Sequence, residues 1–469
     1  MPRSRFEARA SPTRLWEPSR LVLKAFLLKL PCRRVPVASL HDAWPEIVAT
    51  AASFFLVLYS WPAVQRWRAW VDRRAKSLDV ARWLDWRTLT VALGVIFLVA
   101  AFVQSAPVGG CPNTSDDTGS FLYQGQALWM GQDPFQLYRC GVLVPIPIGL
   151  AGILLNALGS LGGRPGIWIV WEFLALLLIP LTWVLAGKDR RFVTLFVASS
   201  GLFVPLVIGQ IEGDNSAFGA VAVLVPVWLA SRGKAGAGLL AGFLSTMKFP
   251  SLFPFLGATG GFGRVRDREM LLTWVGFVGG SAIAWAIWGP VFISTVFFGQ
   301  LGRHDVSVNE FGVLIGTGWF PPVAVLAMLQ GVALFGSVAF VYFRRWPAIP
   351  ALALTTIVVC LVIPRLPFNF LVWLIPLALL GIPYCRWLFV LTAVGALNSA
   401  VAIPLYLNVT QPVYWPSQLL GGLMGLILIL VAFQLVREQQ KGPVDPQRAT
   451  AFRLTGRTAP PPIDLAPPD

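Results

Sequence analysis

Apolar residues in this chain gather into long runs, and shorter polar stretches separate the runs. Between Glu46 and Val436 the runs approach about 20 residues, which is the length that a helix needs to cross the roughly 30 Å hydrocarbon core of a bilayer. The pattern predicts about thirteen hydrophobic segments, at residues 46–64, 89–106, 142–161, 166–186, 192–208, 215–230, 236–258, 271–289, 321–343, 347–364, 368–383, 387–407 and 417–436. Runs of this length favour membrane helices over a β-barrel.

Composition points the same way. The chain has 469 residues, of which 56% are hydrophobic and only 13% are charged, and its mean hydropathy of +0.68 is too high for a single soluble core. We therefore predict an all-α, polytopic transmembrane bundle with about 11–13 hydrophobic segments. We divide it into a basic N-terminal extension at 1–45, a membrane domain at 46–436 and a disordered, Pro-rich cytoplasmic tail at 437–469.

The net charge of +15 would suggest a nucleic-acid partner in a soluble protein, but the cations gather in short loops between segments. Such clustering marks cytoplasmic loops, here at residues 65–87, 188–191, 232–234, 264–268 and 344–345. The opposite loops hold only Arg139, Arg303 and Arg365. We expect no nucleic-acid partner and a polar outer face, and the side of the N-terminus stays open.

Two segments break simple alternation across the membrane. Residues 235–260 have cytoplasmic cations on both sides yet are too short to cross twice. A pair of half-length helices would satisfy both flanks, with Lys248, Phe249 and Pro250 at the turn, because Pro ends a helix and a loop at membrane depth has to line a cavity. Residues 142–186 start outside and end on the cytoplasmic side, so their two segments have to cross the membrane an odd number of times. Pro145 and Pro147 suggest that the first of these segments is re-entrant.

Cysteine and histidine usage limits the chemistry of the chain. Five Cys without CxxC spacing and two His give little basis for a zinc or haem site, and we predict no cofactor and no metal. Cys111 and Cys140 bracket one external loop, so they form either a disulfide in an oxidising compartment or two separate thiols. The absence of a P-loop and of an Asp-x-Asp pair disfavours a nucleotide-sugar substrate.

The first external loop contains CPNTSDDTGSFLYQGQALWMGQDPFQLYRC. Its apolar residues predict an amphipathic helix that lies on the membrane, at Phe121, Leu122, Leu128 and Trp129. Such a helix would hold Asp116 and Asp117 near its N-terminus, where backbone N–H groups favour carboxylates. Both acids are candidate functional residues, and simple capping of this helix is the alternative.

The stretch DDTGSFLYQGQALWMGQDPF resembles the first-loop motif of the GT-C membrane glycosyltransferases of family 87, relatives of polyprenol-phosphate-mannose-dependent mannosyltransferases. The motif's Asp falls on Asp117, with Phe121 in place of the usual Tyr, when the alignment uses Gly131, Asp133, Pro134 and Phe135. The Tyr-Pro-Pro that usually follows is replaced by VPIPIG. The resemblance covers residues 89–380.

Two further stretches resemble the same family in the same order. GQIEGDN corresponds to a Gly-Gln-x-Asn pattern with an insertion before Asn215, and AGLLAGFLSTMKFP corresponds to Ala-Gly followed by Lys-Pro, with Phe249 between Lys248 and Pro250. The loop GQLGRHDVSVNEFG is loosely similar to an Asn-x-Ser segment of the family.

The resemblance implies a GT-C-like fold and an inverting glycosyltransferase of the bacterial plasma membrane. A hexose, mannose being the leading candidate, would pass from a polyprenyl phosphate to a lipid-linked or cell-envelope acceptor on the outer face. Asp117 would be the catalytic base, with the adjacent Asp116 as the alternative. The donor phosphate would be bound by Lys248, Arg303, His304 and Arg365, and the substrates by Gln210, Glu212, Asn215 and Tyr123.

Two other readings of the same residues stay open. A Lys inside an apolar segment costs about 3 kcal/mol on insertion scales, so Lys248 needs a partner or a hydrated cavity unless it snorkels from a helix end. In a transporter or flippase, Lys248 and Glu172 would line a substrate path, although structural hydrogen bonding is the simpler role for Glu172. A non-catalytic scaffold is the third possibility.

Overall fold

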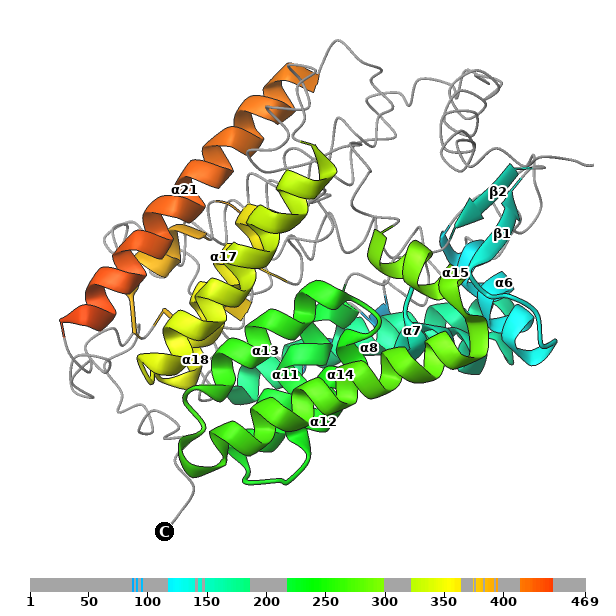
Figure 1. The fold of residues 1–469 in the computed structure, drawn as a ribbon, viewed down its shortest axis with the longest axis horizontal. Coiled ribbons are helices and arrows are strands. Elements are labelled where there is room, and N and C mark those ends of the chain that lie inside the picture. The colour runs from blue at the N-terminus through cyan, green and yellow to red at the C-terminus, as the bar shows by residue number, and fades with distance from the viewer. Residues whose placement is uncertain are drawn as a thin grey trace, which may run out of the picture.

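The computed structural model describes residues 87, 90–91, 94–95, 117–139, 142–145, 148–185, 217–298, 322–363, 374, 377–382, 384–391, 394 and 414–441. Helices dominate this part of the chain (Figure 1). One antiparallel hairpin, which the sequence pattern did not predict, pairs β1 (Gln136–Arg139) with β2 (Val142–Pro145). Its register sets Gln136 opposite Pro145, so the start of the segment predicted at 142–161 is a strand.

By length and composition, four helices of the described residues could cross a membrane. They are α8 (Gly163–Leu185), η4 with α14 (Gly263–Val265 and Arg266–Trp288), α17 (Val323–Phe343) and the 421–440 part of α21 (Tyr414–Gln440). Large apolar side chains such as Phe173, Val278 and Val332 are exposed on them, as expected for helices whose solvent is lipid. These features indicate a multi-pass membrane protein.

Among its described residues, the first segment of 142–186, which the sequence predicts to be re-entrant, forms no helix long enough to span a bilayer. After the hairpin comes α7 (Leu150–Ser160), an apolar helix of 11 residues, which at 1.5 Å per residue reaches only about 16 Å. The chain turns at Leu161 and continues as α8, which has 23 residues. Only α8 of this pair is long enough to span a bilayer.

The predicted pair of half-length helices is also present. α12 (Ala237–Ser245) and α13 (Leu252–Thr259) are separated by the 3-10 turn η3 (Phe249–Ser251). Lys248 directly precedes η3 in an extended conformation, with φ −131° and ψ 91°. We call residues 246–248 the tip of this broken helix.

Both ends of the broken helix lie at the same end of the bundle. Gly238 approaches the carbonyl of Glu269 at the start of α14, and Gly261 approaches Ala348 at the start of α18 (Ala348–Val362). The Arg266 guanidinium lies 4.8 Å from the ring centre of Tyr342 at the end of α17. The turns predicted to be cytoplasmic around 264–268 and 344–345 therefore gather together, while α6 (Asp117–Trp129), α7, α15 (Pro290–Ile293) and the hairpin lie at the far end of α14 (Figure 1).

Glycines let α12 pack directly on the backbone of α14. A Cβ on Gly238 or Gly242 of α12 would lie 2.1 Å from the carbonyl oxygen of Glu269 or 1.9 Å from that of Thr273. A Cβ on Gly276 of α14 would lie 2.2 Å from the carbonyl oxygen of Leu239. The contacts advance together along both helices, which are therefore parallel. Small residues four apart on each helix permit this approach, as in membrane helix pairs.

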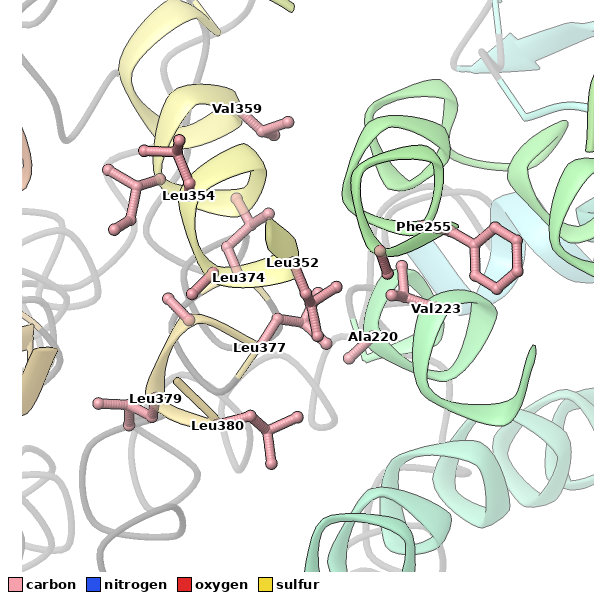
Figure 2. Packing of buried hydrophobic residues seen from close by; sticks show 14 of the residues in the cluster. Ala220, Val223, Phe255, Leu352, Leu354, Val359, Leu374, Leu377, Leu379 and Leu380 are labelled. Atoms are coloured by element: carbon pink, nitrogen blue, oxygen red, sulfur yellow. The ribbon is translucent and has the colours of Figure 1, made fainter. Parts of the chain in front are cut away.

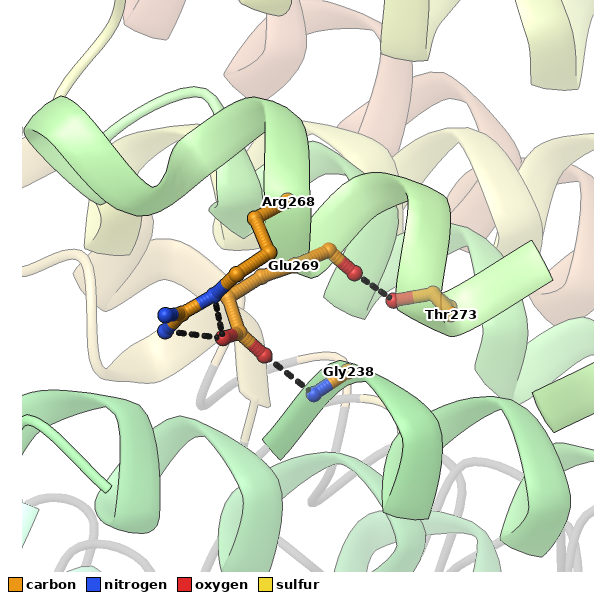
Figure 3. A network of polar contacts seen from close by, with 4 residues as sticks. All are labelled: Gly238, Arg268, Glu269 and Thr273. Atoms are coloured by element: carbon orange, nitrogen blue, oxygen red, sulfur yellow. Dashed lines mark hydrogen bonds and ion pairs between the residues drawn. The ribbon is translucent and has the colours of Figure 1, made fainter. Parts of the chain in front are cut away.

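A buried carboxylate joins the beginnings of the same two helices (Figure 3). Glu269 on α14 has a side chain only 1% exposed, and its Oε2 accepts a hydrogen bond from the Gly238 backbone N–H at 2.7 Å. Its Oε1 accepts one from Arg268 Nη2 at 2.8 Å. Gly238 lies in the first turn of α12, where backbone N–H groups lack partners within the helix. Glu269 therefore caps α12 from a neighbouring helix.

The largest core cluster includes residues of both halves of the broken helix. It joins them to α11 (Phe218–Ser231), α18, α21 and described residues between Leu374 and Val394. Figure 2 shows Leu352 of α18 and Leu377 facing Ala220 of α11. Through α13, this core holds the second half of the broken helix.

We predict that Gly276→Ala destabilises the fold by about 2 kcal/mol, because the added methyl group collides with backbone that cannot move independently. The matched control is Gly279→Ala on the same helix, where a Cβ meets nothing within 4 Å and helix propensity favours Ala. Thermal unfolding of the two purified variants in detergent measures the difference. Equal melting temperatures would contradict the packing described.

We also predict that Glu269→Ala lowers the free energy of unfolding by about 2–3 kcal/mol, because it removes a charged acceptor from a buried backbone N–H. Glu438→Ala is the control, since Glu438 pairs with Lys441 at 2.9 Å on an exposed surface, where an ion pair contributes little. Denaturant titrations of both variants test this. A loss no larger than that of the control would argue against capping by Glu269.

Candidate functional site

The loop that the sequence predicts to be the first external one forms the expected helix as α6, from Asp117 to Trp129. Gly131, in the left-handed region at φ +68°, turns the chain away, and the Gln132 N–H donates to the Ala127 carbonyl at 2.8 Å, as in a glycine-terminated helix end. Its position on the membrane surface stays a prediction, but its apolar side chains divide between the protein interior and the outside. Phe121 is buried against the protein and Trp129 is exposed, because α6 packs on α7 and α8.

The Asp-Pro-Phe part of the motif anchors the loop. Asp133 Oδ1 accepts a hydrogen bond from the Phe135 backbone N–H at 2.9 Å, a local turn that Asp side chains favour. Phe135 is fully buried, and its ring centre lies 5.3 Å from that of Trp288 and 5.6 Å from that of Phe292. Asp133 and Phe135 therefore attach the end of the loop to the junction of α14 and α15.

The tip of the broken helix contacts the beginning of α7. Thr246 Oγ1 accepts a hydrogen bond from the Ala151 backbone N–H at 3.1 Å, which satisfies one donor of the first turn. A Cβ on Gly149 would lie 1.5 Å from the Thr246 carbonyl oxygen, and one on Gly152 would lie 2.8 Å from Met247 Cγ. Because positions 149 and 152 are glycine, the tip can pack directly against the beginning of α7.

Aromatic and apolar side chains from five elements meet beside the tip. Trp171 of α8 lies between Phe121 of α6 and Phe218 of α11, with ring centres 5.7 Å and 6.0 Å away. Met247 of the tip belongs to the same group. We call this group the site cluster; its buried members are Phe121, Leu122, Ile148, Ala151, Ile167, Trp171, Phe218, Ala222 and Met247.

The site cluster brings together chain segments that carry the predicted site residues. Asp117 begins α6 four residues before Phe121, and Lys248 follows Met247 directly. Half-buried Tyr123 packs against the cluster. Phe218 comes three residues after Asn215. The other predicted residues lie outside the described residues: Asp116, Gln210, Glu212, Asn215, Arg303, His304, Arg365, Cys111 and Cys140.

Lys248 lies well inside the bundle. α12 starts beside the beginning of α14, and Thr246 reaches Gly280, fourteen residues after Arg266. At 1.5 Å per residue the tip is about 21 Å from the beginning of α14. The Lys248 carbonyl accepts hydrogen bonds from the backbone N–H and the hydroxyl of Ser251 at 2.9 Å and 2.7 Å. Lys248 is half-buried and distant from the cations that start α14.

Sequence reasoning missed a chain of polar side chains behind the site cluster. The Trp171 indole N–H donates to Asn156 Oδ1 at 3.1 Å, and Asn156 Nδ2 donates to Gln124 Oε1 at 2.7 Å. Gln124 and Asn156 are both 0% exposed. The available signal was Asn156 itself, the one amide side chain in the apolar helix LAGILLNALGS. A buried amide requires partners, and the two hydrogen bonds of Asn156 link α7 to α6 and to α8.

Glu172 occupies the position next to Trp171 in α8. It is 4% exposed, and its Oε1 has no hydrogen-bond partner within the described structure. The structural hydrogen bonding expected for this side chain is therefore missing for one of its two oxygens. Among the residues described, no group of three or more His, Cys, Asp or Glu could hold a metal ion.

Comparisons with models of protein families, with curated proteins and with solved structures find no match to this chain. The likeness to GT-C glycosyltransferases rests on the quoted motifs alone. The function has to be argued from the site.

Proposed function

We propose that this chain is an inverting GT-C-type membrane glycosyltransferase that moves a hexose, mannose first among the candidates, from polyprenyl phosphate to a lipid-linked or cell-envelope acceptor. One observation carries the proposal. The site cluster joins the helix that Asp117 begins to the tip that holds Lys248, although these residues are 131 positions apart in the sequence.

The reaction needs a base beside the acceptor hydroxyl and a positive charge beside the leaving phosphate, both close to the anomeric carbon. An acceptor hydroxyl oxygen attacks the anomeric carbon and loses its proton to the base, while the bond from that carbon to the phosphate oxygen breaks and the polyprenyl phosphate leaves with the electron pair. A carboxylate with an ordinary pKa near 4 is ionised at neutral pH and can take the proton. Asp117, with Asp116 as the alternative, is the proposed base.

Lys248 is the proposed partner of the phosphate. An ammonium group stabilises the negative charge that develops on the leaving phosphate, and the effect is strong where water is excluded. A broken helix is also a known way to place polar groups at membrane depth. Arg303, His304 and Arg365 are proposed as further contacts of the phosphate, and Gln210, Glu212, Asn215 and Tyr123 as contacts of the substrates.

The proposed partners are lipids and glycans. A polyprenyl chain dissolves in the bilayer, so its phosphate would approach the site from the membrane. The site elements lie at the bundle end opposite the turns rich in Arg and Lys, which the positive-inside rule assigns to the cytoplasm. This orientation supports transfer at the outer face, and a bacterial plasma membrane is the location that we propose. The proposed chemistry needs neither cofactor nor metal.

We predict that Asp117→Asn abolishes transfer of radiolabelled mannose from polyprenyl-phosphate-mannose to endogenous lipid acceptors in isolated membranes, because an amide cannot accept the proton. Asp116→Asn is tested beside it to separate the two acids. Asp133→Asn is the control, because its amide oxygen can still accept from the Phe135 N–H, and it should keep wild-type transfer. Normal transfer by both Asp117→Asn and Asp116→Asn would refute a base in this loop.

For Lys248 we predict that Lys248→Met reduces kcat/KM for the polyprenyl-phosphate donor by about 100-fold, since a charged hydrogen bond to phosphate contributes about 1.5–3 kcal/mol. Lys248→Arg keeps the charge and should retain more activity. Initial rates at varied donor concentration provide the measurement. Equal kcat/KM in Lys248→Met and the wild type would remove Lys248 from the site.

Transport of a lipid-linked or small polar substrate is the second candidate, and buried Glu172 is the observation that favours it. Intramembrane acids commonly mark substrate or proton paths. Substrate movement across liposomes by the purified chain, without any transfer of sugar, would favour this function. Transfer by the wild type that survives Glu172→Gln would disfavour it.

A further inference from the structure

The indole of Trp171 determines how two buried amides are oriented. An indole N–H only donates, so the group of Asn156 that faces it at 3.1 Å is the oxygen. The Asn156 Nδ2 must then be the atom that faces Gln124 at 2.7 Å. Because an NH2 group donates, the Gln124 atom opposite it is the oxygen. The order of donors therefore follows from Trp171 and not from a choice of amide orientation.

This order leaves the Gln124 Nε2 at the end of the chain of hydrogen bonds. Gln124 is 0% exposed, and its Nε2 has no hydrogen-bond partner within the described part of the chain. A buried donor without an acceptor destabilises the fold. The amide cannot rotate by 180° to relieve this, because its NH2 would then face the NH2 of Asn156.

The unpartnered donor lies on the first-loop helix, next to the site cluster. Position 124 is seven residues after Asp117 and three after Phe121 in α6, so at 3.6 residues per turn positions 117 and 124 fall on nearly the same side of the helix. Phe121 and Trp171 form part of the site cluster. Gln124 thus offers a neutral N–H donor beside aromatic side chains, on the helix that carries the proposed base.

We propose that the Gln124 amide is the subsite that binds a neutral oxygen of the hexose, a hydroxyl or the ring oxygen, with Asn156 and Trp171 as positioning residues. This inference rests on the proposed glycosyltransferase function. Sites for small polar ligands combine apolar walls with a few oriented polar groups, which is the combination present here. A phosphate fits less well, because a neutral amide compensates poorly for the burial of a charge. The protein covers the amide in this structure, so neighbouring side chains shift when the sugar enters.

The first experiment measures binding with two lipids. Polyprenyl-phosphate-mannose and sugar-free polyprenyl phosphate are added separately to the purified full chain, and the rise in melting temperature is recorded. We expect the mannose-bearing lipid to stabilise the wild type more than the sugar-free lipid. In Gln124→Met, which has a similar volume and no amide, this difference should vanish while the response to the sugar-free lipid remains. Gln126→Met is the control, since Gln126 is an exposed residue of the same helix.

The second experiment identifies which sugar supplies the oxygen. Single-deoxy analogues of the donor mannose and of the acceptor sugar are compared with their parents by kcat/KM. In the wild type, one analogue should react about 10- to 100-fold more slowly than its parent, and Gln124→Met should remove that penalty. A penalty in the donor series supports the binding of the transferred hexose at Gln124, whereas a penalty confined to the acceptor series would overturn this assignment.

The two experiments together can overturn the proposal. If Gln124→Met keeps both the mannose-dependent stabilisation and the full analogue penalty, Gln124 binds no sugar. Should this variant fail to fold, Gln124→Met combined with Asn156→Leu and Trp171→Phe replaces it, because removing the whole chain of hydrogen bonds leaves no member of it unpaired. Wild-type stabilisation by the mannose lipid without transfer would end the glycosyltransferase proposal while still testing Gln124. Transfer without any dependence on Gln124 would end only the subsite.

Discussion

Direct backbone contact between α12 and α14 is the constraint on which the site depends. A helix that stops inside a bilayer leaves backbone groups without partners, so neighbouring elements have to hold it and bond to it. The glycines of the two helices allow the approach, Glu269 caps the beginning of α12, and Thr246 at its end bonds to α7. The tip with Lys248 is consequently held against the beginning of α7, and its Met247 shares the site cluster with Phe121 of the first-loop helix.

The buried polar groups around the broken helix form two separate systems. Glu269 is buried beside the beginning of α12, where the guanidinium of half-exposed Arg268 balances its charge. Gln124, Asn156 and Trp171 are neutral and deeply buried, which avoids the cost of burying a charge. A neutral system that rigidly orients one amide suits selection among sugars, whereas charge on Asp117 and Lys248 suits the proposed chemistry.

The sequence predicted part of the fold. Apolar length identified the four described helices that could cross a membrane, cations on both sides of 235–260 predicted the broken helix, and Pro250 located its turn. It could not predict the hairpin or the burial of Phe121, since both depend on how α6 and α7 pack. The GxxxG spacing of Gly238 and Gly242 is visible in the sequence, but only the structure shows that the backbone of α14 packs on it. The role of Asn156 as a link between helices depends on Gln124 and Trp171, which are 32 and 15 residues away in the sequence. Only the fold brings these three side chains together.

The central claim is that the first-loop helix and the tip share one lipid-phosphate sugar. Photocrosslinking of the purified chain with a polyprenyl-phosphate hexose that carries a diazirine on the sugar tests it most directly, with labelled peptides mapped by mass spectrometry. We expect labelling of α6 around Phe121 and Tyr123 and of the tip around Met247. Excess polyprenyl-phosphate-mannose should reduce this labelling. Labelling confined to the exposed face of α17, around Met328 and Val332, would contradict it.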